Sequence, residues 1–267
     1  MLALALGLSC VAASSRVAPA SPWQLVWSDE FQGPLGAGPD PAKWVFDLGG
    51  EGWGNQELEA YTDSRANARI QDGCLVLEAR REPWQGPDGL LRDFTSARLK
   101  TEGRFSFRYG RVEARIQLPA GKGIWPAFWM LGDRDGERKW PDTGEIDIME
   151  NLGQDPATVH GSVHGPGGAR TWSLSAAFHL GPGQSFSRSF HVFALEWEPD
   201  ALRFYVDDAL YQTRTRADLP ADGRWVFDHP FHLLLDLAVG GDWPGAPDAE
   251  TRFPQQMKVA YVRVYSR

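Results

Sequence analysis

Cysteine is scarce in this chain of 267 residues, which contains only Cys10 and Cys74. Two cysteines cannot build the disulfide framework that holds many small secreted domains together. Cys74 begins the alternating run CLVLEAR at residues 74–80. We therefore expect it to be a buried free thiol that packs as a small hydrophobic side chain.

Basic residues are too few to balance the acidic ones. The 27 Lys and Arg residues stand against 35 Asp and Glu residues, and the formal net charge is −8. Nucleic acids and anionic membranes attract proteins through clusters of basic residues, so we expect neither as a partner. A neutral partner needs no such clusters.

Long hydrophobic runs are missing, apart from a short one at the start of the chain. Residues 1–13 are apolar and end in small residues suited to signal peptidase, although the usual basic residues before them are lacking. The run is too short to span a membrane. We expect a signal peptide and short leader over residues 1–21, with the cleavage position open, and a secreted protein, extracellular or periplasmic. Lipid attachment at Cys10 is the weaker alternative, because Gly7-Leu8-Ser9 poorly matches the residues that usually precede a lipidated cysteine.

A long helical period is also absent, and short alternating runs between Gly, Pro and Asp residues take its place. Asp207-Asp208 predicts a tight hairpin turn. Many antiparallel strands without crossover helices predict an all-β fold, a two-sheet antiparallel β-sandwich of jelly-roll type. The length suits one domain over residues 22–267, which we expect to be a monomer. The runs that we expect to be strands cover residues 74–80, 104–118, 190–208, 231–239 and 259–266.

Three acids lie close together in the segment GEIDIMEN at residues 144–151. On a regular strand Glu145 and Asp147 share one face, and Glu150 would enter the core, where an unpaired carboxylate costs on the order of 2 to 7 kcal/mol. A β-bulge at Ile148-Met149 would return Glu150 to the face of the other two acids. Glu145 and Glu150 would then approach the ~5 to 5.5 Å separation of the carboxyl groups in retaining glycosidases.

Two other interpretations of this segment are an exposed acidic strand edge and a calcium-binding loop. The residues between the acids are Ile and Met, whereas an exposed edge would favour Lys or Thr. A calcium loop carries its oxygen ligands on a flexible turn that contains Gly. The apolar setting therefore favours a catalytic pair of carboxylates.

GEIDIMEN closely resembles the signature of glycoside hydrolase family 16, in the bulged form of its laminarinase branch (endo-1,3-beta-glucanases). The resemblance covers nearly the whole chain after the leader. It includes SDEF at 28–31, GNQELEAYT at 54–62, TSARLKT at 95–101, YGRVEARIQLPAGKGIWPAFWMLG at 109–132, VHGSVHGPG at 159–167, AVGGDWPG at 238–245 and YVRVY at 261–265.

The resemblance implies a sandwich with a concave cleft and retaining hydrolysis of a β-1,3-glucan such as laminarin, by double displacement. Glu145 would be the nucleophile, Glu150 the acid and base, and Asp147 would tune their protonation. The same fold also acts on agar, carrageenan and mixed-linkage glucan. A glucan-binding module without catalysis is the rival, and the retention of all three acids argues against it.

Several residues are candidates for holding the sugar chain. In IWPAFWM the alternation places Trp125 and Trp129 on one face, where flat rings can stack on sugars. The resemblance adds Trp243, and it assigns sugar-hydroxyl contacts to Asn55, Arg98 and His164. His160 and His164 lie too far apart on a strand to chelate one metal ion easily.

The chain departs from the family pattern at two positions. Asp236 stands where Asn is usual; it would either add a negative charge near the cleft or be a hydrogen-bonded structural acid, and we expect the second. Ala260 stands where an Asp usually supplies the acidic ligand of a calcium ion that is also held by backbone oxygens near Glu30 and Gly73. Calcium needs carboxylate oxygens for tight binding, so we expect no required cofactor and doubt a structural calcium.

Overall fold

The computed structural model describes residues 23–87, 89–168 and 170–267. The expected leader over residues 1–21 and Cys10 lie outside these residues. Within the described residues the chain forms strands and one 3-10 turn, η1 (Arg216–Asp218). The strands are β1 (Gln24–Asp29), β2 (Val45–Asp47), β3 (Glu59–Tyr61), β4 (Ala68–Gln71), β5 (Cys74–Gln85), β6 (Leu91–Ser96), β7 (Arg98–Lys100), β8 (Gly110–Gln117), β9 (Ile124–Gly132), β10 (Glu145–Glu150), β11 (Thr158–Pro166), β12 (Thr171–His179), β13 (His191–Glu198), β14 (Ala201–Val206), β15 (Ala209–Thr215), β16 (Phe231–Val239) and β17 (Gln255–Ser266).

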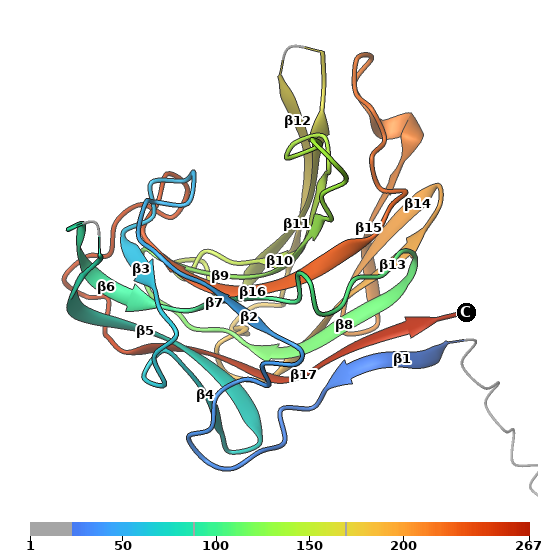
Figure 1. Cartoon of the computed structure of the whole chain (residues 1–267). Coiled ribbons are helices and arrows are strands. Elements are labelled where there is room, and N and C mark those ends of the chain that lie inside the picture. The colour runs from blue at the N-terminus through green and yellow to red at the C-terminus, as the bar shows by residue number, and fades with distance from the viewer. Residues whose placement is uncertain (1–22, 88, 169) are drawn as a thin grey trace, which may run out of the picture.

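These strands make two sheets that lie one above the other (Figure 1). The seven-stranded sheet has the order β12-β11-β10-β9-β16-β7-β2, counted over the described residues. The ten-stranded sheet has the order β15-β14-β13-β8-β17-β5-β6-β3, with β1 paired to β17 and β4 paired to β5, over the same residues. The pairing is antiparallel except between β3 and β6. The predicted all-β jelly-roll sandwich is thus confirmed.

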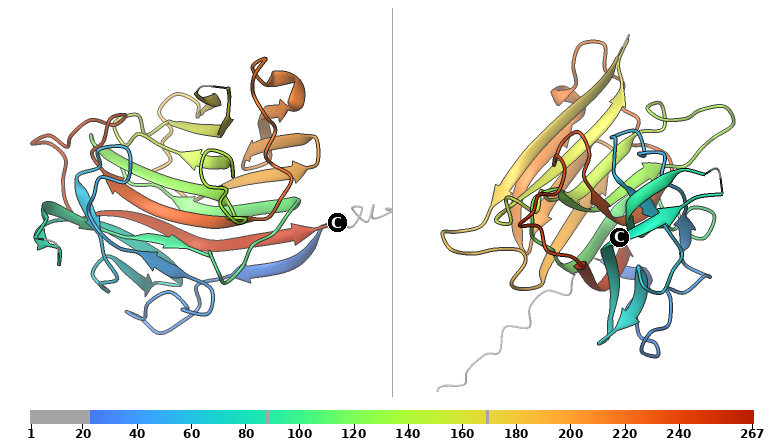
Figure 2. Two further views of the ribbon diagram at one scale, coloured as in Figure 1. Left: turned by 45° about the horizontal axis from the view of Figure 1, so that its top comes forward. Right: turned by 90° about the vertical axis from the view of Figure 1, so that its left-hand side faces the viewer.

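The core lies between the two sheets. Figure 2 shows the arrangement of these sheets from two further directions. Strand β16 contributes Leu233, Leu235 and Leu237 to the core, and β9 contributes Phe128 and Met130. The outward residues of β9 are Trp125, Ala127 and Trp129, as the alternation predicted. The outer face of the seven-stranded sheet is therefore free to carry the site.

Several local predictions can be compared with the strands. The predicted hairpin turn is confirmed, because Asp207-Asp208 joins β14 to β15 directly. The expected strand over residues 104–118 is shorter, because β8 begins at Gly110 and Phe107 makes only an isolated bridge to Phe231. Cys74 is a free thiol, but the prediction that it is buried was wrong: it begins β5 next to the turn at Gly73 and is partly exposed.

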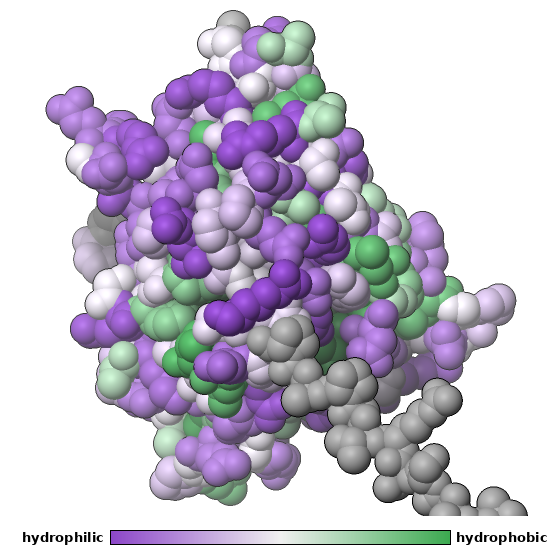
Figure 3. All heavy atoms as spheres, turned by 90° about the vertical axis from the view of Figure 1, so that its right-hand side faces the viewer, coloured by the Kyte–Doolittle hydropathy of each residue, from purple (hydrophilic) through white to green (hydrophobic). Residues whose placement is uncertain are grey.

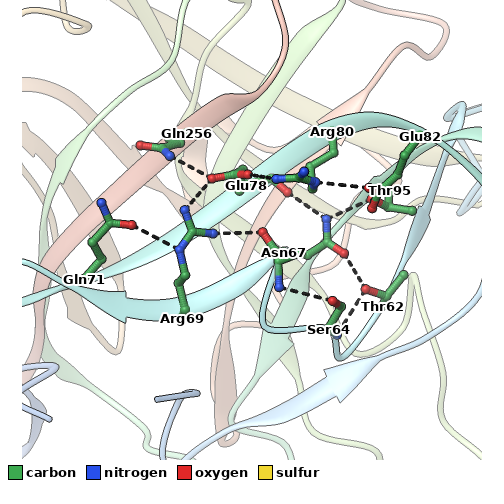
Figure 4. A network of polar contacts seen from close by, with 11 residues as sticks. Thr62, Ser64, Asn67, Arg69, Gln71, Glu78, Arg80, Glu82, Thr95 and Gln256 are labelled. Atoms are coloured by element: carbon green, nitrogen blue, oxygen red, sulfur yellow. Dashed lines mark hydrogen bonds and ion pairs between the residues drawn. The ribbon is translucent and has the colours of Figure 1, made fainter. Parts of the chain in front are cut away.

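A buried polar network ties β4, β5, β6 and β17 together away from the cleft (Figure 4). The carboxylate of Glu78 is 2% exposed; it accepts hydrogen bonds from Arg69 (2.5 Å) and Gln256 (2.7 Å) and pairs with Arg80. Burial would raise the pKa of Glu78, but the hydrogen bonds from Arg69 and Gln256 hold it below its usual range. This acid is therefore ionised and structural.

The surface beside the C-terminal end of β17 is mostly hydrophilic, with small hydrophobic groups (Figure 3). Exposed large hydrophobic side chains occur singly or in pairs along the chain, as in Leu25 and Val26 of β1 and Leu210 of β15. Scattered apolar residues of this kind are normal for a protein surface. None of the described residues forms a helix long and apolar enough to cross a membrane.

Candidate active site

A cleft of about 540 Å³ lies on the outer face of the seven-stranded sheet. Its floor comes from β7, β9, β10, β11 and β16, and its walls come from the loops that precede β3 and β10. The lining residues are Trp53, Gly54, Asn55, Glu57, Arg98, Trp125, Ala127, Trp129, Leu131, Trp140, Glu145, Asp147, Glu150, His164, Thr171, Asp236 and Ala238.

Strand β10 contains a bulge that brings its three acids to this face. Asp147 lies opposite Trp129 of β9, Met149 opposite Phe128, and the register shifts between the two pairs. The predicted bulge at Ile148-Met149 is confirmed. Both bulge residues are buried in the core, whereas Glu145, Asp147 and Glu150 all line the cleft.

Neighbouring side chains hold these acids in place. The indole N–H of Trp125 donates to Oε1 of Glu150 at 3.1 Å, and Ser162 Oγ lies 3.5 Å from its Oε2. His164 Nε2 lies 2.9 Å from Oδ2 of Asp147. The imidazole on β11 and the middle acid of β10 therefore form a pair beside the two glutamates.

Burial changes the protonation of all three acids. Burial and the charge of Asp147 raise the pKa of Glu145, and burial also raises the pKa of Asp147. Burial, Asp147 and Glu145 raise the pKa of Glu150 well above its usual range. The three carboxyl groups influence one another, so they titrate as one group.

The floor beside Glu150 is open because a small residue lies there. Ala127 pairs with Glu150 on one side and with Asp236 of β16 on the other. Neighbouring strands lie about 4.8 Å apart, so the backbones of the two acids are roughly 10 Å apart across the alanine. A sugar ring could rest on this floor between the two carboxyl groups.

Arg98 lines the cleft, but most of its side chain is buried. Its guanidinium lies between the rings of Trp53 and Trp129, 4.8 Å and 4.7 Å from their centroids. It also forms an ion pair with Asp47 at 3.0 Å. These contacts make Arg98 a support for the aromatic wall as well as a candidate sugar contact.

Two further predicted binding residues take different positions. Asn55 lines the cleft and donates from Nδ2 to Oε1 of Glu57 at 2.9 Å. Trp243 is 41% exposed and is not among the lining residues. Its ring packs edge-on against Trp125, with centroids 5.5 Å apart, and against His160 at 5.0 Å. Trp243 therefore supports Trp125 from outside the cleft.

Sequence reasoning missed Trp53, Glu57 and Trp140, which also line the cleft. Trp140 is half exposed, and its hydrogen bond to Glu145 partly offsets the effects of burial and Asp147 that raise the pKa of that acid. All three residues lie in irregular loops, where no alternation indicates the direction of a side chain. The only available signal was their closeness in sequence to Asn55 and Glu145.

The expected position for calcium differs from a typical ion site. The Glu30 carboxylate accepts two hydrogen bonds from Arg263, at 2.8 Å and 2.9 Å. Ala260 is the extra residue at a register shift in β17, and it has only its backbone oxygen to offer. In the described part of the chain no group of three metal-ligating side chains includes Glu30. The residues present fit calcium poorly, and weak or absent calcium binding stays a prediction.

Comparison with known proteins gives consistent matches along the chain. The model of "Glycosyl hydrolases family 16" matches residues 55–263. A beta-glucanase from Rhodothermus marinus is 46% identical over 278 residues, covering 99% of this chain and 92% of the relative.

Solved structures resemble the whole sandwich. The laminarinase catalytic domain from Thermotoga maritima is 50% identical with a TM-score of 0.85, covering 92% of this chain and 98% of that one. The endo-beta-1,3-glucanase from Pyrococcus furiosus is 48% identical with a TM-score of 0.85, covering 91% and 94%. These similarities extend over both sheets and the cleft.

Proposed function

Because the chain belongs to glycosyl hydrolase family 16, we propose that it is an endo-acting β-glucanase that cleaves β-1,3-glucan of the laminarin type with retention of configuration. The bulge in β10 carries this proposal. It brings Glu145 and Glu150 to the same face of the cleft, as a nucleophile and an acid of a retaining glycosidase require.

The proposed reaction proceeds in two displacements. In the first, a carboxylate oxygen of Glu145 attacks the anomeric carbon while Glu150 gives its proton to the leaving glycosidic oxygen. In the second, Glu150 takes a proton from water, which attacks the same carbon and releases Glu145. Burial raises the pKa of both glutamates, so the pair holds a proton near neutral pH, which in the proposed mechanism lies on Glu150 while Glu145 is ionised.

The walls of the cleft support a neutral sugar chain as the substrate. Trp125 and Trp129 present partly exposed rings on the floor, and flat aromatic faces pack well on the apolar faces of sugars. The similar solved proteins are described as laminarinases and endo-β-1,3-glucanases, which favours β-1,3-glucan over agar, carrageenan or mixed-linkage glucan.

Release of reducing ends from laminarin, compared with lichenan, agarose and carrageenan, tests the substrate. We expect laminarin to give the highest rate, with oligosaccharides as early products. Binding of laminarin without release of any reducing ends would instead identify a glucan-binding module. Proton NMR of the first product should show the β-anomer, and an initial α-anomer would require an inverting mechanism with carboxyl groups about 6.5 to 9.5 Å apart.

A further inference from the structure

Asp236 is a fourth acid in the cleft, outside the group on β10. Its side chain is 6% exposed, and its strand β16 lies between β7 and β9. Oδ1 accepts a hydrogen bond from Nε1 of Trp129 at 2.5 Å, and Oδ2 lies 3.4 Å from the hydroxyl oxygen of Tyr61. The expectation of a hydrogen-bonded structural acid is confirmed by these contacts, but they leave open which atom carries the proton.

The hydroxyl of Tyr61 decides this question, because it has a single proton. It donates that proton to Oε2 of Glu57, which is the closer acceptor at 2.9 Å. The other oxygen of Glu57 accepts from Asn55 at 2.9 Å, so both oxygens of this carboxyl group act as acceptors. Tyr61 has no second proton for Asp236, so the 3.4 Å contact, long for an O–H···O hydrogen bond, can become one only if Oδ2 of Asp236 carries the proton.

Charges of both signs surround Asp236, and burial decides between its two forms. Glu57, from the loop before β3, and Asp147 on β10 face it with like charge. Arg98 on β7 is its backbone partner and has the opposite charge, but among the described residues its ion pair is with Asp47. Strand β9 contributes no charge, only the indole of Trp129. Burial therefore raises the pKa of Asp236 to about 7, against the opposing effect of Arg98.

We propose that Asp236 is a positioning residue that acts as a neutral carboxylic acid, accepting a hydrogen bond from Trp129 and donating one to Tyr61. The result is a continuous chain of hydrogen bonds from Trp129 through Asp236, Tyr61 and Glu57 to Asn55. This chain holds the aromatic floor and the loop before β3 in one arrangement. Loss of the proton removes the hydrogen bond to Tyr61 and adds a negative charge facing Asp147.

Replacing Asp236 by Asn tests this assignment, because the amide keeps an acceptor and a donor and cannot ionise. Asp208→Asn is the matched control, since it makes the same chemical change at an exposed hairpin turn. The first measurement is the melting temperature Tm at pH 5 to 8. We expect the Tm of D236N minus that of the wild type to rise with pH, because a buried acid with a raised pKa loses stability as it ionises. The same difference for D208N should stay flat.

The second measurement is kcat/KM on laminarin over the same pH range, and this part rests on the proposed function. The ratio of D236N to wild type should rise about tenfold from pH 6 to pH 8, as an acid with a pKa of about 7 goes from about nine-tenths to about one-tenth protonated. The charge of Asp236 also raises the pKa of Asp147 in the wild type, so the limbs of the two pH profiles are compared together with the ratio.

A Tm difference that is flat or falls with pH would overturn the proposal, because Asp236 would then be an anion in the folded protein. A constant activity ratio would overturn the positioning role, leaving Asp236 with only a structural one. Failure of the proposed function looks different: the wild type would release no sugar, while the Tm comparison would still decide the protonation of Asp236.

Discussion

Replacing Glu145 by Ala should abolish hydrolysis and leave glucan binding nearly intact. Glu145 lies at the start of β10 in the cleft, and its oxygen is the atom proposed to bond to the anomeric carbon. Alanine leaves Glu150 and its hydrogen bond from Trp125 in place, so proton donation survives while the attacking atom is lost. Because that atom acts mainly in the transition state, kcat should fall and the Kd for laminarin oligosaccharides should change little.

The size of the fall follows from what remains in the site. Asp147 is paired with His164 and lies two residues along β10 from Glu145, so it is not placed to substitute for that nucleophile. We expect kcat/KM to fall by at least about 10³-fold, which corresponds to about 4 kcal/mol of barrier. Reducing-sugar release measures this directly. The control is Glu137→Ala, the same change at an exposed position in the loop before β10.

Azide provides a second readout for the same variant. The space left by the Glu145 carboxylate can admit this small anion, which would attack from the same side while Glu150 protonates the leaving oxygen. The product should be a glycosyl azide of α configuration, visible by NMR. If Glu145→Ala kept a tenth of the wild-type turnover, a barrier change of only about 1.4 kcal/mol, the nucleophile assignment would be wrong.

Three further changes test other parts of the structure. Asp147→Asn should slow turnover and move both limbs of the bell-shaped pH profile to lower pH, because the lost negative charge is one that raises the pKa of Glu145 and of Glu150; an unchanged profile would make Asp147 a spectator. Glu78→Ala should lower stability by about 3 kcal/mol in chemical denaturation, since Arg69 loses its buried partner, and a loss below about 0.5 kcal/mol would contradict the role of that network. Tm values in millimolar calcium and in EDTA should agree within about two degrees, and a rise of five degrees or more with calcium would reveal a tight site despite Ala260.

Local patterns in the sequence were enough to predict the sheet elements and the bulge. The run at residues 231–239 matches β16 from end to end, because Pro230 and the glycines after Val239 limit it on both sides. The bulge followed from the spacing of the acids, since a regular strand would have buried Glu150 among core residues. In both cases the deciding residues are neighbours in the chain.

The strand expected from residue 104 shows where local patterns fail. RFSF alternates as well as any strand in the chain, yet Phe105 and Phe107 pack against Trp27 and Trp197 outside a regular ladder. Alternation predicts which side chains can be buried together. Strand formation also needs a partner with free backbone groups, and only Phe231 provides a bridge there.

The surroundings of Asp236 depend on contacts that no short segment contains. Its partner Tyr61 lies 175 positions away in the chain, and Trp129 lies 107 positions away. The run LLLDLAV alone therefore does not show whether its acid becomes an exposed anion, a paired carboxylate or a neutral donor in the folded protein. The sequence indicated the chemistry of the cleft because Glu145, Asp147 and Glu150 share one strand. The contacts that connect Trp129, Asp236 and Tyr61 could not be predicted in that way. They join β9, β16 and β3, which come together only when the seven-stranded sheet has formed beside β3.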